Sequence, residues 1–318
     1  MKPEPEQKMR IGISQCLLGK NVRYDGGHKL DRYLVGSYSA YFDWVPFCPE
    51  AESGMGIPRE AMRLEGDFAA PRLITRNSRI DKTEQLLQWT IPRVQRMAHE
   101  DLCGIIFKKG SPSCGLYGMK PLTEKGMPGE SGPGLFAREV IKQHPYLPME
   151  EEGRLQDPTL RELFVEKVFV FGRWKELLKN PSLKAFMLFH QRHKYLIMAH
   201  SPEKLKLLGA IVAQCKSQLE EALNKYFDLL MEALSLKATL RKNRNVLQHI
   251  MGYFKKDLGA DEKQELIEEI ENYSNELVPL IVPITLLKHF VRKFQQSYLL
   301  EQYYLQPHPK ELMIRNQV

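Results

Sequence analysis

The sequence predicts an α/β N-terminal domain with a mostly parallel, Rossmann-like sheet, followed by an all-α C-terminal domain. In the first half, short apolar runs alternate with helical patterns, which is typical of βαβ units. From residue 160 onward, apolar residues recur at helical spacing and no strand pattern competes. The length of 318 residues also favours two domains. We therefore expect domains at 1–155 and 160–318.

Three apolar runs of the first half are predicted strands, and each is followed by a loop that carries a cysteine. They cover residues 9–14, 44–47 and 102–107. Residues 72–75 form another possible strand, and helices are expected at about 30–39 and 82–99.

A glycine- and proline-rich loop then covers 115–134, with a short helix near 135–142 and an acidic connection over 145–158. The second half predicts helices at 164–178, 182–199, 202–233 with a possible break, 234–256, 261–275 and 286–302.

Composition places the chain among ordinary soluble proteins, with 43% apolar and 27% charged residues. The N-terminus is polar, and no uninterrupted apolar run approaches the roughly 18–20 residues of a membrane span. We therefore expect a cytoplasmic protein that does not enter membranes. Its five cysteines are too few and odd in number for a disulfide framework, so reduced thiols or metal ligands are expected.

Positive charge is concentrated in one part of the second half. The whole chain has a net charge of +7, whereas residues 161–256 hold 18 lysines and arginines against 8 acidic residues. This asymmetry indicates a face that binds a polyanion such as nucleic acid. A solvated basic surface without a partner explains the charge equally well.

Cys16, Cys48 and Cys114 each lie just beyond a predicted strand. If these strands are parallel neighbours, the three thiols converge at the sheet edge where open α/β sheets bind ligands. Three thiolates suit a [4Fe-4S] cluster with one open iron, or a catalytic zinc. Spacing alone favours a third reading, buried structural thiols, which Cys103 and Cys215 also fit. Cys-x-x-Cys pairs and Walker loops are absent from the sequence.

Several motifs resemble known families. The segments ISQCLLG (13–19), RYDGG (23–27), CPE (48–50), GIPR (56–59) and SPSCG (111–115) resemble the thiouracil desulfidase (TudS) family, over roughly residues 9–155. The segment FHQRHKYLIMAHSP (189–202) resembles a YbgA-type helical domain. The fusion of the two is similar to bacterial tRNA 4-thiouridine desulfidases.

The resemblance implies an activity and a set of residues. The activity is non-redox, hydrolytic C–S cleavage that converts 4-thiouridine in tRNA to uridine and releases sulfide. It implies that Cys16, Cys48 and Cys114 hold a [4Fe-4S] cluster, and that Glu50 and Ser111 act in catalysis. We further expect substrate contacts from Arg23, Tyr24 and Asp25. The candidate tRNA contacts in the helical domain are Arg192, Lys194, Arg241, Lys242 and Arg244.

Two alternatives remain open at the level of sequence. The chain could desulfurise free thiolated uracil bases or nucleotides, with the helical domain serving another partner. It could instead be a non-catalytic iron–sulfur sensor that binds RNA. No obligate protein partner is indicated.

Overall fold

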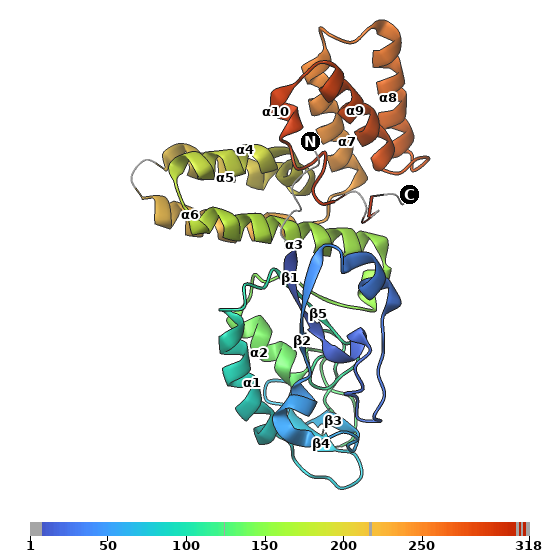
Figure 1. The fold of residues 1–318 in the computed structure, drawn as a ribbon, viewed down its shortest axis with the longest axis vertical. Helices are drawn as coiled ribbons and strands as arrows, with labels where there is room; N and C mark the ends of the chain where they lie inside the picture. Colours follow the sequence, from blue (N-terminus) through green and yellow to red (C-terminus); the bar gives the residue numbers. More distant parts are fainter. Residues whose placement is uncertain (1–7, 124, 216–217, 310–311, 313, 316–318) are drawn as a thin grey trace. The chain divides into compact units, whose positions relative to one another are not determined.

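A four-stranded parallel sheet forms the centre of the first half of the chain in the computed structural model. Its strands are β1 (Met9–Ser14), β2 (Phe42–Phe47), β5 (Gly104–Phe107) and β6 (Met149–Glu151). The order across the sheet is β2-β1-β5-β6, and every neighbouring pair is parallel. The three predicted strands that precede cysteines are therefore adjacent, with β1 in the middle (Figure 1).

The structure describes residues 8–123, 125–215, 218–309, 312, 314 and 315. The chain divides into two units, Met1–Phe164 and Val165–Val318, and the division falls within helix α3 (Pro158–Lys179). The sheet belongs to the first unit and the second is helical, which confirms the predicted fold class. Among the described helices, none is both long enough and apolar enough to cross a membrane.

The sheet is held by apolar side chains from its two central strands. All four residues of β5 are buried, as are the last four of β1. Helices α1 (Thr83–Met97) and α2 (Leu135–Gln143) contact each other and pack on one face of the sheet (Figure 1). Val94 of α1 and Phe136 of α2 share a buried cluster with Ile105 of β5. This packing fixes where the carboxyl ends of the strands lie.

Two local predictions need correction, and a third is confirmed. Strand β6 lies in the stretch 145–158, which we expected to be an acidic connection. Two of its three residues are glutamates, so it lacks the apolar pattern of a buried strand; both glutamates are nevertheless buried, because they are hydrogen-bonded. The strand expected at 72–75 is confirmed as β4 (Arg72–Thr75); it pairs antiparallel with β3 (Met62–Glu65) in a separate two-stranded sheet. The helix expected at 30–39 is a single π-helical turn, η2 (Leu34–Tyr38).

The second unit consists of helices that begin at clear sequence signals. Ser182, Ser201 and Thr239 each accept a hydrogen bond from a backbone N–H of the following helix, as N-caps do. The helices after α3 are α4 (Leu183–His200), α5 (Pro202–Gln214), α6 (Leu219–Ser235), α7 (Leu240–Met251), α8 (Ala260–Ser274), α9 (Ile281–Lys293) and α10 (Ser297–Leu300).

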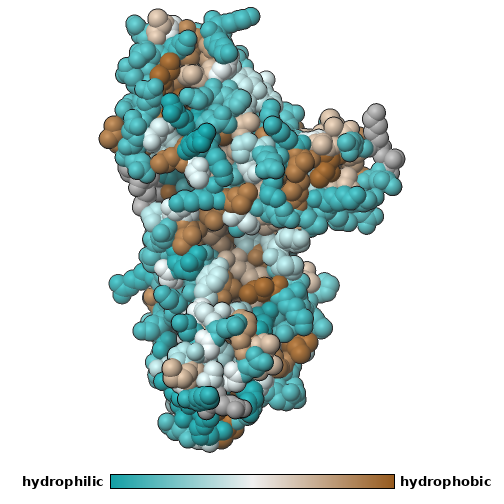
Figure 2. Space-filling view, turned by 180° about the vertical axis from the view of Figure 1, so that it is seen from behind, coloured by the Kyte–Doolittle hydropathy of each residue, from teal (hydrophilic) through white to brown (hydrophobic). Residues whose placement is uncertain are grey.

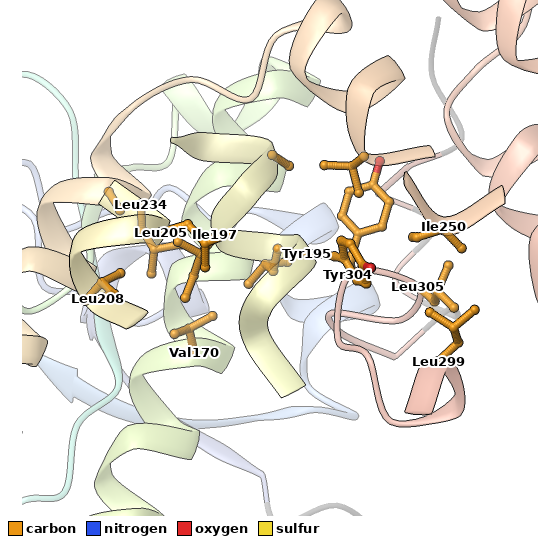
Figure 3. Close-up of a cluster of buried hydrophobic side chains, with 14 of the residues drawn as sticks. Val170, Tyr195, Ile197, Leu205, Leu208, Leu234, Ile250, Leu299, Tyr304 and Leu305 are labelled. Carbon is orange, nitrogen blue, oxygen red and sulfur yellow. The ribbon is translucent and has the colours of Figure 1, made fainter. Parts of the chain in front are cut away.

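The core of this unit draws on every long helix from α3 to α9. Figure 3 shows side chains from α3 to α7 meeting those of the C-terminal segment, among them Val170, Leu208 and Tyr304. Phe186 and Phe189 of α4 are buried against Trp174 of α3. On the surface, hydrophilic residues cover much of the face shown in Figure 2, with scattered apolar side chains between them.

A buried charged cluster ties α3, α4 and the C-terminal segment together. The Glu166 carboxylate bonds the imidazole Nε2 of His200 and lies 3.1 Å from Nη2 of Arg315. All three residues are buried. Burial would raise the pKa of Glu166, but the charges of His200 and Arg315 outweigh it and lower the pKa to about 2. Burial would likewise lower the pKa of His200, but the Glu166 charge raises it.

Replacing Glu166 by Gln should therefore destabilise the protein. The substitution removes the buried carboxylate charge that His200 and Arg315 share, and breaking a buried ion pair typically costs about 3–5 kcal/mol. Urea denaturation at pH 7 measures the change. Glu221→Gln is the matched control, because the Glu221–Lys225 pair on α6 is exposed and should contribute less than about 1 kcal/mol.

The pH dependence of this difference has a defined sign. The Glu166 contribution is present above the ordinary carboxyl pKa of about 4.3 and is lost as pH falls toward the lowered value. The His200 contribution is complete below about pH 6.5 and is lost as pH rises through its raised pKa. A wild-type to Glu166→Gln difference that stays constant from pH 3 to 9 would contradict this account.

Candidate active site

Three cysteine thiols from three strand ends line one cavity of about 310 Å³. Cys16 lies in the short 3-10 turn η1 (Gln15–Leu18) after β1, Cys48 follows β2 directly, and Cys114 is in the loop after β5. All five cysteines are free thiols, and Cys103 and Cys215 are buried outside this lining. The parallel strand order thus brings together cysteines that are 32 and 66 residues apart in sequence.

The three thiols interact electrostatically. Burial, and then the charge of Cys48, raise the pKa of Cys16 to about 11. Burial also raises the pKa of Cys48, and it raises that of Cys114 well above its usual range, with further contributions from Cys48, Glu50 and Cys16. Ionised together, these thiols would repel one another. A metal centre held between them reverses this preference, because coordination deprotonates a thiol.

The three candidate donors in the cavity are all thiols, the ligand type of both iron–sulfur clusters and zinc sites. Four thiolates around one zinc stand about 3.8 Å apart, given Zn–S bonds of about 2.3 Å. Within the described part of the chain, no three His, Cys, Asp or Glu side chains are grouped closely enough for one ion. In an iron–sulfur cluster each thiolate binds a different iron, so the sulfurs stand further apart. An all-thiol set in one cavity suits an iron–sulfur cluster, and a catalytic zinc stays the alternative.

Glu50 is a buried residue that lines the same cavity as these thiols and lies immediately before the π-helical turn η3 (Ala51–Met55). Its Oε2 accepts hydrogen bonds from Nη2 and Nε of Arg59, at 2.6 and 2.9 Å. Its Oε1 accepts from the hydroxyls of Ser113 at 2.7 Å and Ser111 at 3.2 Å. A buried carboxylate with four donors is held in one orientation.

The loop of Cys114 is fixed by hydrogen bonds at both of its ends. At its start, the Ser14 hydroxyl accepts the Lys108 N–H at 2.9 Å and so joins the ends of β1 and β5. At its end, the Glu151 carboxylate of β6 accepts the N–H groups of Leu116 and Tyr117. Within the loop, Oγ of Ser111 accepts the Cys114 N–H at 3.1 Å. Ser111 therefore connects the backbone of a candidate ligand to the Glu50 carboxylate.

The predicted substrate contacts divide into two groups. Arg23 and Tyr24 line the cavity, with the guanidinium 5.3 Å from the ring centroid. Asp25 lies outside the lining residues; its carboxylate accepts hydrogen bonds from Arg23 and from the Gly27 N–H. Asp25 thus shapes the loop and orients Arg23.

Sequence reasoning missed several cavity residues. Arg59 and Ser113 both lie inside motifs that we quoted, so motif membership was the signal that could have found them. Arg76 and Lys109 also line the cavity, and both are exposed. Nothing in their local sequence distinguishes them from other surface cations. No described residue forms an ion pair with either of them, in contrast to Arg23, Arg59 and Lys108, which pair with Asp25, Glu50 and Glu152.

The five candidate tRNA contacts lie on α4 and α7, which pack against each other. Arg241 and Arg244 are exposed. Arg192 pairs with Glu301 at 3.2 Å, and the Lys194 ammonium lies 5.7 Å from the Tyr195 ring centroid. Lys242 donates to the carbonyls of His200 and Lys237, at 2.7 and 3.0 Å. The Lys242 ammonium therefore has a structural role at the C-terminal end of α4.

Comparison with known proteins gives matches to two separate parts of the chain. The 2-thiouracil desulfurase family matches residues 11–152, and a family described as a protein of unknown function (DUF1722) matches residues 194–309. The uncharacterised protein YbgA of Escherichia coli (strain K12) is 30% identical over 165 residues, which cover 51% of this chain and 95% of YbgA. The chain belongs to the YbgA family. It joins a DUF1722 domain of this kind to a 2-thiouracil desulfurase domain.

Among solved structures, the chain is similar to a [4Fe-4S]-dependent thiouracil desulfidase, TudS. The identity is 26% with a TM-score of 0.38, and the match covers 47% of this chain and 95% of that one. The family match over residues 11–152 supports a desulfidase role for this YbgA-family chain, since those residues include the whole cavity lining.

Substitution of the cavity cysteines should separate ligands from structural thiols. We expect Cys16→Ala, Cys48→Ala and Cys114→Ala each to abolish iron binding, because a three-thiol site cannot hold its centre with two. Cys103→Ala and Cys215→Ala are matched controls and should retain iron, because both are buried thiols outside the cavity. Iron and sulfide assays with an absorption spectrum after anaerobic purification measure this. Stoichiometric zinc without a visible chromophore would rule out the cluster.

Proposed function

We propose that this chain is an iron–sulfur-dependent desulfidase that converts 4-thiouridine in tRNA to uridine. The reaction is hydrolytic and non-redox: water supplies the oxygen of the new carbonyl, and the sulfur leaves as sulfide. The observation that carries the proposal is the meeting of three thiols with Glu50 and Ser111 in one cavity of a 2-thiouracil desulfurase domain.

Cys16, Cys48 and Cys114 would hold a [4Fe-4S] cluster, and the cluster's fourth iron would have no protein ligand. When bound, the cluster would supply a Lewis-acidic iron with affinity for the sulfur of a thiocarbonyl. The protein's own contribution is the set of three thiols and the burial of two of them. Cys16 and Cys114 are buried, which keeps solvent away from the centre.

Glu50 is the proposed general base. A base must lie within hydrogen-bond reach of the water whose proton it removes, directly or through one intervening group. The Ser111 hydroxyl, 3.2 Å from Oε1 of Glu50, can carry that proton because a hydroxyl both donates and accepts. Glu50 thus accepts the proton, and Ser111 orients the water or the base ring beside Cys114.

Charge on the cavity favours a nucleotide within RNA over a free base. Arg76 and Lys109 lie at the exposed end of a cavity whose thiol end is buried. Two cations without a described ion-pair partner suit a phosphate, which a nucleotide carries and a free base lacks. The basic stretch 161–256, most of which lies in the second unit, suits a longer polyanion. These observations support tRNA as the substrate.

The general-base role predicts the effect of an isosteric substitution. Glu50→Gln should retain iron and tRNA binding but lower kcat at least about a hundredfold, since positioned proton transfer contributes about 10² to 10⁴ in rate. Ser111→Ala should lose less. Single-turnover sulfide release from 4-thiouridine tRNA measures both. Glu52→Gln is the control. Glu52 lies outside the cavity lining, and the amide oxygen of a glutamine can still accept the Cys48 N–H that Glu52 accepts. A Glu50→Gln protein with wild-type turnover would show that another group activates the water.

The tRNA proposal predicts a strong salt dependence. Neutralising phosphates releases counterions, so tRNA affinity should fall steeply with salt, and each lost contact should lessen the slope by about one unit. Arg241→Gln and Arg244→Gln are the informative variants, because both side chains are exposed on α7. Lys263→Gln, on the acidic α8, is the matched control. A slope near zero in the wild type would count against tRNA.

Comparing substrates decides between the proposal and its alternatives. The wild type should release sulfide faster from 4-thiouridine tRNA than from free 4-thiouracil, because only the tRNA engages the cations at the cavity and on the second unit. Free base turned over at least as fast as tRNA would identify a desulfidase of free bases, as the family name suggests. Tight tRNA binding with no sulfide release from any substrate would identify a non-catalytic sensor.

A further inference from the structure

We infer that Arg59 is a positioning residue, whose guanidinium holds the Glu50 carboxylate in the orientation that proton transfer requires. The inference rests on the proposed function and adds a residue to its machinery. Arg59 reaches Glu50 across nine residues of chain, from the far side of η3. The two side chains are only 7% and 11% exposed, so the pair is shielded from solvent.

The guanidinium makes contacts in two directions. Nε and Nη2 both donate to Oε2 of Glu50. Nη1 donates to the carbonyls of Val22 at 3.0 Å and Gly56 at 3.1 Å. Four hydrogen bonds therefore use four of the five N–H groups of the side chain. Because four of its N–H groups are bonded, the Arg59 side chain makes all of these bonds in a single conformation.

This arrangement makes the two oxygens of Glu50 inequivalent. A carboxylate oxygen has two lone pairs, and both of those on Oε2 face Arg59 donors. Oε1 instead contacts the hydroxyls of Ser111 and Ser113, which can rotate and release it. A proton arriving from the cavity is therefore received at Oε1. Arg59 therefore selects the carboxylate oxygen that receives the proton.

Arg59 also links Glu50 to the loop that carries the candidate substrate contacts. Its backbone N–H donates to the Tyr24 carbonyl at 2.8 Å. The Val22 carbonyl that accepts from Nη1 lies 3.8 Å from the Cys48 thiol. Lysine could not reproduce these contacts, because one ammonium on a flexible stem lacks the planar fork that reaches Glu50, Val22 and Gly56 together.

The experiment is a double-mutant cycle on sulfide release from 4-thiouridine tRNA. It uses the wild type, Arg59→Ala, Glu50→Gln and the double variant, each with iron content, tRNA affinity and melting temperature measured. We expect Arg59→Ala to lower kcat at least about tenfold with KM and iron content unchanged. The double variant should be no slower than Glu50→Gln alone, because residues that act as one unit are not additive.

Added guanidinium ion supplies a second readout that a purely structural role would not move. It should restore part of the kcat of Arg59→Ala and have no effect on Glu50→Gln. Arg59→Lys should recover less than half of the loss. Arg79→Ala, which breaks an ion pair with Glu65 outside the cavity lining, is the matched control and should neither lose activity nor respond to guanidinium.

Each failure has a distinct outcome. Losses that multiply in the double variant, or the absence of guanidinium rescue, would overturn the role of Arg59 while leaving the desulfidase intact. If Arg59→Ala loses iron or fails to fold, Arg59→Gln, which keeps donors of similar reach, takes its place in the cycle. An iron-loaded wild type that releases no sulfide from any thiolated substrate overturns the proposed function and this inference with it.

Discussion

The parallel pairing of β1 with both β2 and β5 is the constraint on which the candidate site depends. Parallel neighbours end at the same edge of a sheet, so the loops after these strands share one crevice. Cys16, Cys48 and Cys114 belong to those loops and line the same cavity. A strand order that separated β1 from either neighbour would move one thiol away from the other two.

Buried carboxylates then set the positions of the loops. Glu50 gathers Arg59, Ser111 and Ser113, while Glu151 holds the backbone just after Cys114. Each carboxylate is buried, and each is satisfied by several donors, as a buried charge must be. The loops around the thiols are therefore held by polar bonds at the carboxyl ends of the strands, where the apolar core gives way to the cavity.

The second unit also contains a buried carboxylate, Glu166, that is satisfied by more than one partner. Its core is apolar along α3 to α9, yet Glu166, His200 and Arg315 form a charged cluster within it. The cluster joins residues 149 positions apart and so attaches the C-terminal segment to α3. Lys242 shows why counting charges overstates the charge that is free to bind a partner: it counts toward the basic stretch, but its ammonium bonds backbone carbonyls.

The sequence by itself determined the fold class, the strands that precede cysteines and the motifs that contain the cavity residues. These features depend on local patterns, namely apolar periodicity, glycine and proline loops, and short spacings, which need no knowledge of distant contacts. The starts of α4 and α5 also agree with the helices predicted from 182 and 202, whereas α7 begins at Leu240 and not at the predicted 234.

Only the tertiary structure decided which of these residues meet. Strand β6 escaped detection because its glutamates are buried by bonds to the Cys114 loop and to Arg154, partners that sequence does not reveal. The roles of Arg59 and Arg76 differ for the same reason. Both are arginines near the hairpin, but one is paired with a buried carboxylate and the other is exposed at the cavity. The sequence gives the charge of a side chain but not its partner. Ion pairs join residues that are distant in sequence, and strand order and packing decide which of them meet.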